Sequence, residues 1–161
     1  EEDAWDLVQR VNVKGTYLCS RAVAREMILH GNGGKILIIS STKGKRGEAC
    51  FAAYSASKFA VIGFGQSLAL ELAPHQIQVN IICPGMVETE RISDMAAAMA
   101  RKGGAVEEHR SQMLRERAAE IPLGRVAEGA DIARVAAFLA SSESDYMTGL
   151  AISVTGGTQL G

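Results

Sequence analysis

Residues 36–83 read ILIISSTKGKRGEACFAAYSASKFAVIGFGQSLALELAPHQIQVNIIC, and this stretch decides the fold. Residues 36–39 form a short apolar run rich in β-branched side chains, which is typical of a fully buried strand. Residues 52–73 are apolar at almost every position and predict a helix that is covered on more than one side. Residues 77–83 repeat the buried-strand pattern. A strand, a helix and a strand in this order predict a right-handed parallel crossover.

The flanking segments extend this pattern. Residues 4–29 predict a long helix with one apolar face, because apolar side chains recur at spacings of three, four or seven: Trp5, Val8, Val11, Leu18 and Ala22. Residues 86–130 predict two mobile helices over a cleft. Residues 131–140 predict an amphipathic helix, and residues 150–154 a third strand. The predicted fold class is therefore α/β with a mainly parallel sheet.

The composition excludes several classes of protein. A length of 161 residues fits one domain, and 47% apolar with 22% charged residues provides for a buried core. Seventeen Lys and Arg against eighteen Asp and Glu leave no positive excess to neutralise nucleic-acid phosphates. No apolar run approaches the roughly 18 residues of a membrane span. We therefore expect a globular protein that binds neither nucleic acid nor a membrane.

The cysteines indicate a compartment. Cys19, Cys50 and Cys83 are odd in number, widely spaced and without a CxxC motif, which suits reduced thiols in a cytoplasmic protein. The chain opens with Glu1, and its first residues already read as helix. We therefore expect it to be the later part of a longer chain.

The loops after the first two strands are the candidate site, because open parallel sheets bind ligands beyond the carboxyl ends of their strands. Ser41 opens the first of these loops. Tyr54 follows thirteen residues later, and Lys58 lies four residues after Tyr54, on the same face of the helix. The pattern is therefore a serine followed by Tyr-x-x-x-Lys.

This pattern suits chemistry on a carbonyl or an alcohol. A tyrosine hydroxyl with an ordinary pKa near 10 is a poor acid or base at neutral pH, but an ammonium within roughly 4 to 6 Å favours the phenolate. Lys58 is spaced to supply that charge. Ser41 could bond the substrate oxygen while Tyr54 exchanges a proton with it. Such a site still needs a hydride donor or acceptor, which no side chain supplies.

At these residues the sequence resembles the short-chain dehydrogenase/reductase family, and the resemblance runs from end to end. The matching motifs are Asn12 in VNVKG, Ile39-Ser40-Ser41, Tyr54 through Lys58 (YSASK), Val79-Asn80 through Thr89, and Ser153 through Gly157 (SVTGG). The resemblance implies a Rossmann-like, doubly wound parallel sheet that is incomplete, with three C-terminal strands and their covering helices. Residues 1–161 would be the C-terminal catalytic portion of one such domain, with a lid at 90–120.

The resemblance also implies a role for each catalytic residue. Tyr54 would be the general acid and base, and Ser41 would orient the substrate. Lys58 would also bind the nicotinamide ribose, and Asn12 would hold a water in a proton relay. The implied reaction transfers hydride between NAD or NADP and a secondary alcohol or ketone.

The nicotinamide and pyrophosphate side would be lined by four further residues: Pro84, Gly85, Val87 and Thr89. The family's glycine-rich dinucleotide turn, and the residue that selects NAD or NADP, have no counterpart in residues 1–161. The first strand also exposes its edge unless another segment pairs with it. We therefore expect that the adenine-binding half lies elsewhere, or that the chain is an inactive, truncated member that acts as an oligomerisation fragment.

Self-association is expected from the helices. One sheet cannot cover all the apolar faces of residues 52–73, so a partner helix must contact them. Residues 4–29 should join this contact, and the resemblance implies a homodimer or homotetramer.

Several residues have a simpler alternative explanation. Asn12 could be an amide on a helix face, and Thr89 could cap the following helix. Lys43, Lys45 and Arg46 could form a solvated turn or attract an anionic substrate. The methionines at 86, 95, 99 and 113 could fill the core or line a lid that repacks around substrates. The three histidines lie far apart at positions 30, 75 and 109, so we expect no metal site.

Overall fold

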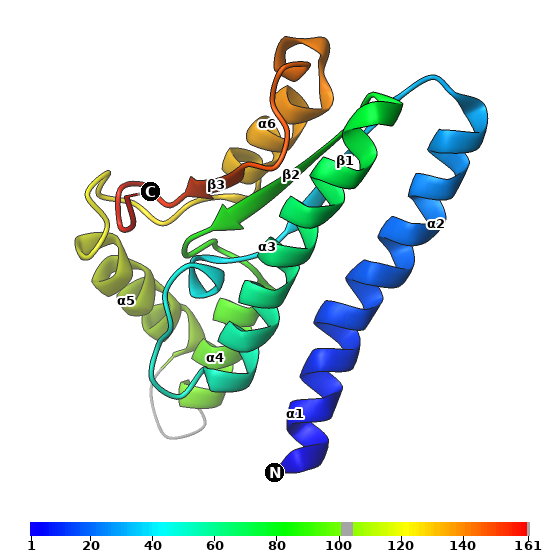
Figure 1. Cartoon of the computed structure of the whole chain (residues 1–161). Coiled ribbons are helices and arrows are strands. Elements are labelled where there is room, and N and C mark those ends of the chain that lie inside the picture. The colour runs from blue at the N-terminus through cyan, green and yellow to red at the C-terminus, as the bar shows by residue number, and fades with distance from the viewer. Residues whose placement is uncertain (101–104, 161) are drawn as a thin grey trace.

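The computed structural model describes residues 1–100 and 105–160, apart from the side chains at positions 91, 95 and 99. Two of the four methionines of the predicted lid, and the glycine pair at 103–104, thus lie outside the described residues. The described chain forms a three-stranded sheet with helices packed on both faces (Figure 1).

The sheet consists of β1 (Gly34–Ile39), β2 (Ile77–Pro84) and β3 (Ala151–Val154), in the order β1-β2-β3. Both pairings are parallel, which confirms the predicted crossover between β1 and β2. In the register, Gly34 lies opposite Ile77, and Pro84 lies opposite Val154. β1 is an edge strand, as predicted, and a groove of about 420 Å³ separates its free edge from the helix before it.

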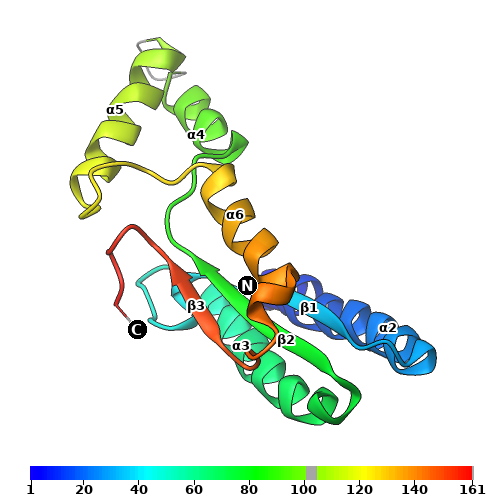
Figure 2. The ribbon, with the colours of Figure 1, turned by 90° about the horizontal axis from the view of Figure 1, so that it is seen from above.

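The helices form two layers around the sheet (Figure 2). α1 (Glu2–Gln9), α2 (Gly15–His30) and α3 (Ala52–Leu72) lie on one side, and α6 (Gly129–Ala140) lies on the other. A buried apolar cluster lies between the first layer and the strands: Ala24, Ile36, Ile38, Val61, Ala69, Leu72, Ile77, Val79, Ile81 and Cys83. Among the described residues, no helix combines the length and the apolar content needed to cross a membrane.

Gly65 sets the distance between α3 and the sheet. A Cβ atom on this glycine would lie 2.8 Å from Cγ1 of Ile81 and 3.0 Å from Cδ1 of Ile38. The helix can therefore pack this closely on β1 and β2 only because position 65 carries no side chain.

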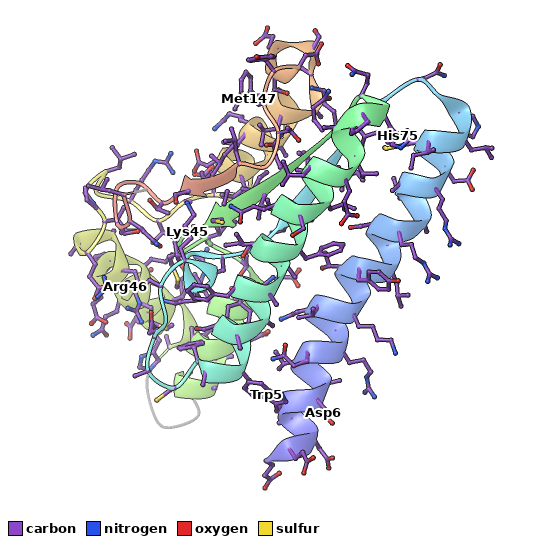
Figure 3. All side chains as sticks on the ribbon, viewed as in Figure 1. Trp5, Asp6, Lys45, Arg46, His75 and Met147 are labelled. Atoms are coloured by element: carbon purple, nitrogen blue, oxygen red, sulfur yellow. The ribbon has the colours of Figure 1, made fainter. Side chains whose placement is uncertain are left out.

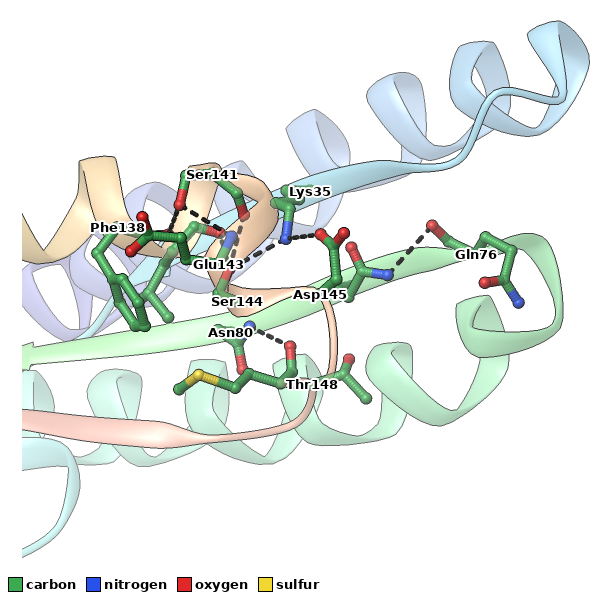
Figure 4. Close-up of polar contacts among 12 residues, drawn as sticks. Lys35, Gln76, Asn80, Phe138, Ser141, Glu143, Ser144, Asp145 and Thr148 are labelled. Atoms are coloured by element: carbon green, nitrogen blue, oxygen red, sulfur yellow. Dashed lines mark hydrogen bonds and ion pairs between the residues drawn. The ribbon is translucent and has the colours of Figure 1, made fainter.

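Asn80 holds the segment that leads into β3 (Figure 4). Its side chain is 1% exposed, donates a hydrogen bond from Nδ2 to the carbonyl of Met147 (2.7 Å), and accepts one at Oδ1 from the amide of Leu150 (3.1 Å). The hydroxyl of Thr148 accepts a further bond from the amide of Val79 (3.0 Å). Side chains thus position the last strand against the central one.

Replacement of Asn80 by leucine is expected to lower the free energy of unfolding by about 1–2 kcal/mol, because it leaves the part-buried amide of Leu150 and carbonyl of Met147 without their partner. Urea titration of the chain measures this change. Asn32→Leu, in the exposed turn before β1, is the control and should change the value by less than about 0.5 kcal/mol. Equal effects of the two substitutions would contradict the role given to Asn80.

α4 (Glu90–Ala100) and α5 (Val106–Ala119) pack against each other and stand away from the sheet (Figure 2). The segments that lead into and out of this pair are bonded together, because the amide of Glu88 donates to Ala127 (2.8 Å) and the amide of Ala127 donates to Met86 (3.2 Å). Arg110 on α5 also forms an ion pair with Glu88. The pair is thus a hairpin of helices joined to the core through these two segments, and the amide of Leu123, after α5, donates a further bond to the carbonyl of Gly156 (3.1 Å).

Candidate active site

The carboxyl ends of the three strands lie at one end of the molecule. Figure 3 shows Lys45 and Arg46 at this end, and His75 and Met147 at the opposite end of the sheet. Three segments start here: residues 40–51, 85–89 and 155–160.

Ser40 and Ser41 follow β1 and have different partners. Ser40 is buried and donates its hydroxyl to the carbonyl of Lys58 (2.9 Å). Ser41 has extended backbone, and its Oγ accepts the amide of Lys43 (3.2 Å), which caps the short helical turn Thr42–Gly44. The Ser41 hydroxyl proton therefore stays available to a substrate oxygen.

Tyr54 and Lys58 lie in the first two turns of α3. The Nζ atom of Lys58 is 5.6 Å from the centroid of the Tyr54 ring and donates a hydrogen bond to the carbonyl of Ile39 (3.1 Å). Lys58 thus joins the tyrosine to the end of the strand that carries Ser41. Burial lowers the pKa of the Lys58 ammonium below its ordinary value.

The lowered pKa of Lys58 gives a prediction for stability. Between the lowered folded-state pKa and the unfolded value of 10.5, the unfolded chain holds a proton that the folded chain has released, so stability rises with pH in this window. The unfolding free energy of the wild-type chain is therefore expected to rise relative to that of Lys58→Met as the pH increases from about 7 to about 10. Urea titrations at several pH values measure the difference. A constant or falling difference would contradict a buried ammonium.

Asn12 lies in an irregular part of the N-terminal helix. Residues Arg10–Lys14 form a π-helical turn between α1 and α2, in which the amide of Gly15 donates to Arg10, and Thr16 donates its hydroxyl to the carbonyl of Asn12 (2.7 Å). π-helical turns of this kind are frequent at functional sites. The sequence predicted one continuous helix here, because hydrophobic spacing carries no signal for a π-helical turn.

The Asn12 side chain contacts α3 beside the tyrosine. Its Nδ2 donates to Oγ of Ser57 (3.0 Å), and Ser57 donates to the carbonyl of Tyr54 (2.7 Å). Gln9 adds a bond to the carbonyl of Ala53 (3.1 Å). The structure therefore brings Asn12 to the backbone of Tyr54 through Ser57, a residue that sequence reasoning passed over.

The residues proposed for the cofactor divide into two groups. Pro84 and Gly85 lie at the sheet, where the amide of Gly85 donates to the carbonyl of Val154 (2.9 Å). Val87 forms a bridge with Ala127 in the connection to α4. Thr89 directly precedes α4, and its carbonyl accepts the amide of Ile92 (2.9 Å). Only the first group therefore borders the strand ends.

Cys83 is a further residue at the end of β2, and it is fully buried. Burial raises the pKa of its thiol, against the smaller opposing effects of the Lys45 charge and of hydrogen bonds with Ser40 and Ser41. The thiol thus lies directly behind the serine turn. Its place in the sequence before Pro84 was the only signal of this proximity.

A parallel α/β sheet with serine, tyrosine and lysine side chains gathered at the strand ends defines a Rossmann-like class of protein, in which ligands bind beyond the carboxyl ends of the strands. The family model described as enoyl-(acyl carrier protein) reductase matches residues 1–159. The chain belongs to the short-chain dehydrogenase/reductase family.

Two curated relatives show the extent of this likeness. The chain is 39% identical over 155 residues to the sorbitol dehydrogenase of Cereibacter sphaeroides, a match that covers 96% of the chain and 59% of the relative. It is 40% identical over 156 residues to the (3R)-3-hydroxyacyl-CoA dehydrogenase of Homo sapiens, which covers 97% of the chain and 54% of the relative. The chain thus spans little more than half the length of these relatives.

A solved structure confirms the fold. The chain is similar to the sorbitol-6-phosphate 2-dehydrogenase of Erwinia amylovora with a TM-score of 0.89 and 34% identity, over 99% of this chain and 62% of that one. The incomplete, three-stranded Rossmann-like sheet predicted from the sequence is therefore confirmed.

Proposed function

We propose that the protein transfers hydride between a nicotinamide cofactor, NAD or NADP, and a secondary alcohol or ketone. The observation that carries this proposal is the position of Lys58, whose ammonium lies beside the Tyr54 ring and is bonded to the end of the strand that carries Ser41. This arrangement supports a proton-transfer site at the mouth of the sheet. The dehydrogenase names of the relatives support the same class of reaction.

The donor groups at the site fit the nicotinamide half of such a cofactor. An ammonium has three N–H donors, and Lys58 gives one of them to Ile39. The other two suit the hydroxyls of a ribose. Pro84 and Gly85 border the same strand ends and would contact the nicotinamide, with Val87 and Thr89 further along toward the pyrophosphate. Bound there, the nicotinamide supplies or accepts the hydride.

The side chains of this chain would do the remaining work. Ser41 donates its hydroxyl to the substrate oxygen, while its own oxygen is held by the Lys43 amide. Tyr54 gives its proton to that oxygen in reduction and takes it back in oxidation. The charge of Lys58 favours the negative charge that develops on Tyr54. Asn12 would hold a water that passes protons to solvent.

We further propose that α4 and α5 act as a lid over the substrate. The paired segments 86–88 and 126–128, which join both helices to the core, support a hinge. Both helices follow the candidate cofactor residues directly.

Fluorescence titration with NADH and NADPH tests the proposed reaction. Saturable binding by the full-length protein, together with turnover of sorbitol or another secondary alcohol, is expected. No binding at about millimolar cofactor would favour the inactive alternative.

The alternative, an oligomerisation fragment, is supported by the exposed apolar side chains of the first helical layer. These include Trp5, Leu7, Val11, Tyr17, Leu18, Val23, Phe59 and Leu70. The apolar face predicted for residues 4–29 is thus largely open, and α2 buries only Ser20 and Ala24. We propose that this face pairs with a second copy in a homodimer or homotetramer. A monodisperse monomer in light scattering would contradict this pairing.

The three cysteines also bear on the compartment. All are free, and Cys19 and Cys50 are exposed. Exposed thiols persist in a reducing environment, which supports our proposal that the protein acts in the cytoplasm.

A further inference from the structure

A polar hollow of about 470 Å³ lies beside the serine turn. It is formed by the loop after β1 and by residues that follow β3: Thr42, Lys43, Arg46, Gly47, Glu48, Ala49, Thr158 and Gln159. The lining begins at the residue after Ser41, so the hollow borders the turn that carries this serine.

The hollow is also close to Tyr54. The Nζ atom of Lys43 lies 5.8 Å from the centroid of the Phe51 ring. The Phe51 ring contacts the Tyr54 ring edge to face, with centroids 6.4 Å apart. One aromatic ring therefore separates Lys43 from the tyrosine, and a small substrate is long enough to span this distance.

Positive charge predominates around the hollow. Lys43 forms an ion pair with Glu48, whereas Arg46 has no ion-pair partner in the part of the chain that the structure describes. Arg117 of α5, which forms an ion pair with Glu120 (3.1 Å), is a third cation nearby. After burial, the charges of Arg117 and Arg46 lower the pKa of Lys43, so both of them repel the Lys43 ammonium.

We propose that this hollow binds an anionic group of the alcohol substrate, either a phosphate monoester or a carboxylate. Arg46 supplies an unpaired guanidinium, which suits both groups because its planar N–H donors bind their oxygens in pairs. Lys43 lies on the same wall, and Arg117 approaches from the proposed lid. A bound anion would relieve the repulsion among the three cations and draw α5 toward the serine loop.

This inference deepens the proposed function and rests on it. It predicts that the active site prefers alcohols that carry an anionic group, because a neutral substrate has no charge to pair with the cations. The other explanation of this loop is a solvated turn whose charges contact only water. The two explanations differ in what happens when the charge of Arg46 is removed.

The experiment compares three related compounds with the full-length enzyme: sorbitol, gluconate and sorbitol 6-phosphate. The wild type is expected to bind at least one of the two anions about tenfold more tightly than sorbitol. Arg46→Gln and Arg117→Gln should each weaken the binding of that anion by about tenfold and leave the binding of sorbitol unchanged. Arg25→Gln, an exposed arginine on α2, is the matched control and should change neither.

The two anions distinguish the chemistry. Preference for sorbitol 6-phosphate alone assigns the hollow to a phosphate, and preference for gluconate alone assigns it to a carboxylate. Wild-type binding of both anions by the Arg46 and Arg117 variants would overturn the proposal, as would no preference for either anion over sorbitol.

Calorimetry separates this inference from the proposed reaction. The dissociation constants of the three compounds are measured without cofactor, so they do not depend on turnover. If anion binding depends on Arg46 but the protein has no dehydrogenase activity, the anion site is supported and the proposed function fails. If the protein turns over neutral alcohols and its anion binding does not depend on Arg46, the proposed anion site is wrong and the proposed function stands.

Discussion

Replacement of Tyr54 by phenylalanine is expected to lower kcat of the full-length enzyme by about 10²–10⁴-fold, while the dissociation constant for the cofactor stays within about twofold. The substitution removes one oxygen, the atom that exchanges a proton with the substrate. It keeps the ring, which contacts Phe51 at 6.4 Å between centroids and faces the Lys58 ammonium. Steady-state kinetics measures the first effect, and fluorescence titration with NADH or NADPH measures the second.

The chain offers a matched control for this experiment. Tyr146 is fully exposed in the segment before β3, far from the strand ends that carry the site. Tyr146→Phe makes the same chemical change and should leave kcat unaltered. Near-normal turnover by Tyr54→Phe would remove the proton-transfer role from this residue, and with it the main support for the proposed reaction.

Replacement of Gly65 by valine is expected to lower the free energy of unfolding by about 2–3 kcal/mol relative to Gly63→Val. A Cβ at position 65 would lie 2.8 Å from Ile81 Cγ1, so the new side chain must push α3 away from the sheet. A Cβ at position 63 would meet no atom within 4 Å. Both substitutions change the helix propensity of α3 equally, so their difference isolates the packing at position 65.

Urea titration of the two variants at one protein concentration measures this difference. Gly65→Val should also weaken the active site in the full-length enzyme, because Tyr54 and Lys58 lie on the same helix and are positioned against the end of β1. Equal stability of the two variants would show that the helix can move from the sheet without cost. The close approach of α3 would then not depend on Gly65.

The sequence by itself predicted the features that depend on neighbours along the chain. The strands at residues 36–39 and 77–83 were predicted from uninterrupted apolar runs, and both are present with small extensions at their ends. The position of Lys58 beside Tyr54 follows from helical periodicity alone, because residues four apart share a face.

Contacts between distant segments were decided only by the tertiary structure. Asn12 reaches α3 through Ser57, 45 residues away, from a π-helical turn that no spacing rule predicts. The hydrogen bonds of the Asn80 side chain with the segment before β3 join residues up to 70 positions apart in the sequence. From the sequence alone, the same side-chain amide could equally have faced solvent. The charge of Arg117, on α5, lowers the pKa of Lys43, although the two residues are 74 positions apart in the sequence. Periodicity and local propensity determine elements within a few residues, whereas packing of the whole chain determines which polar groups meet.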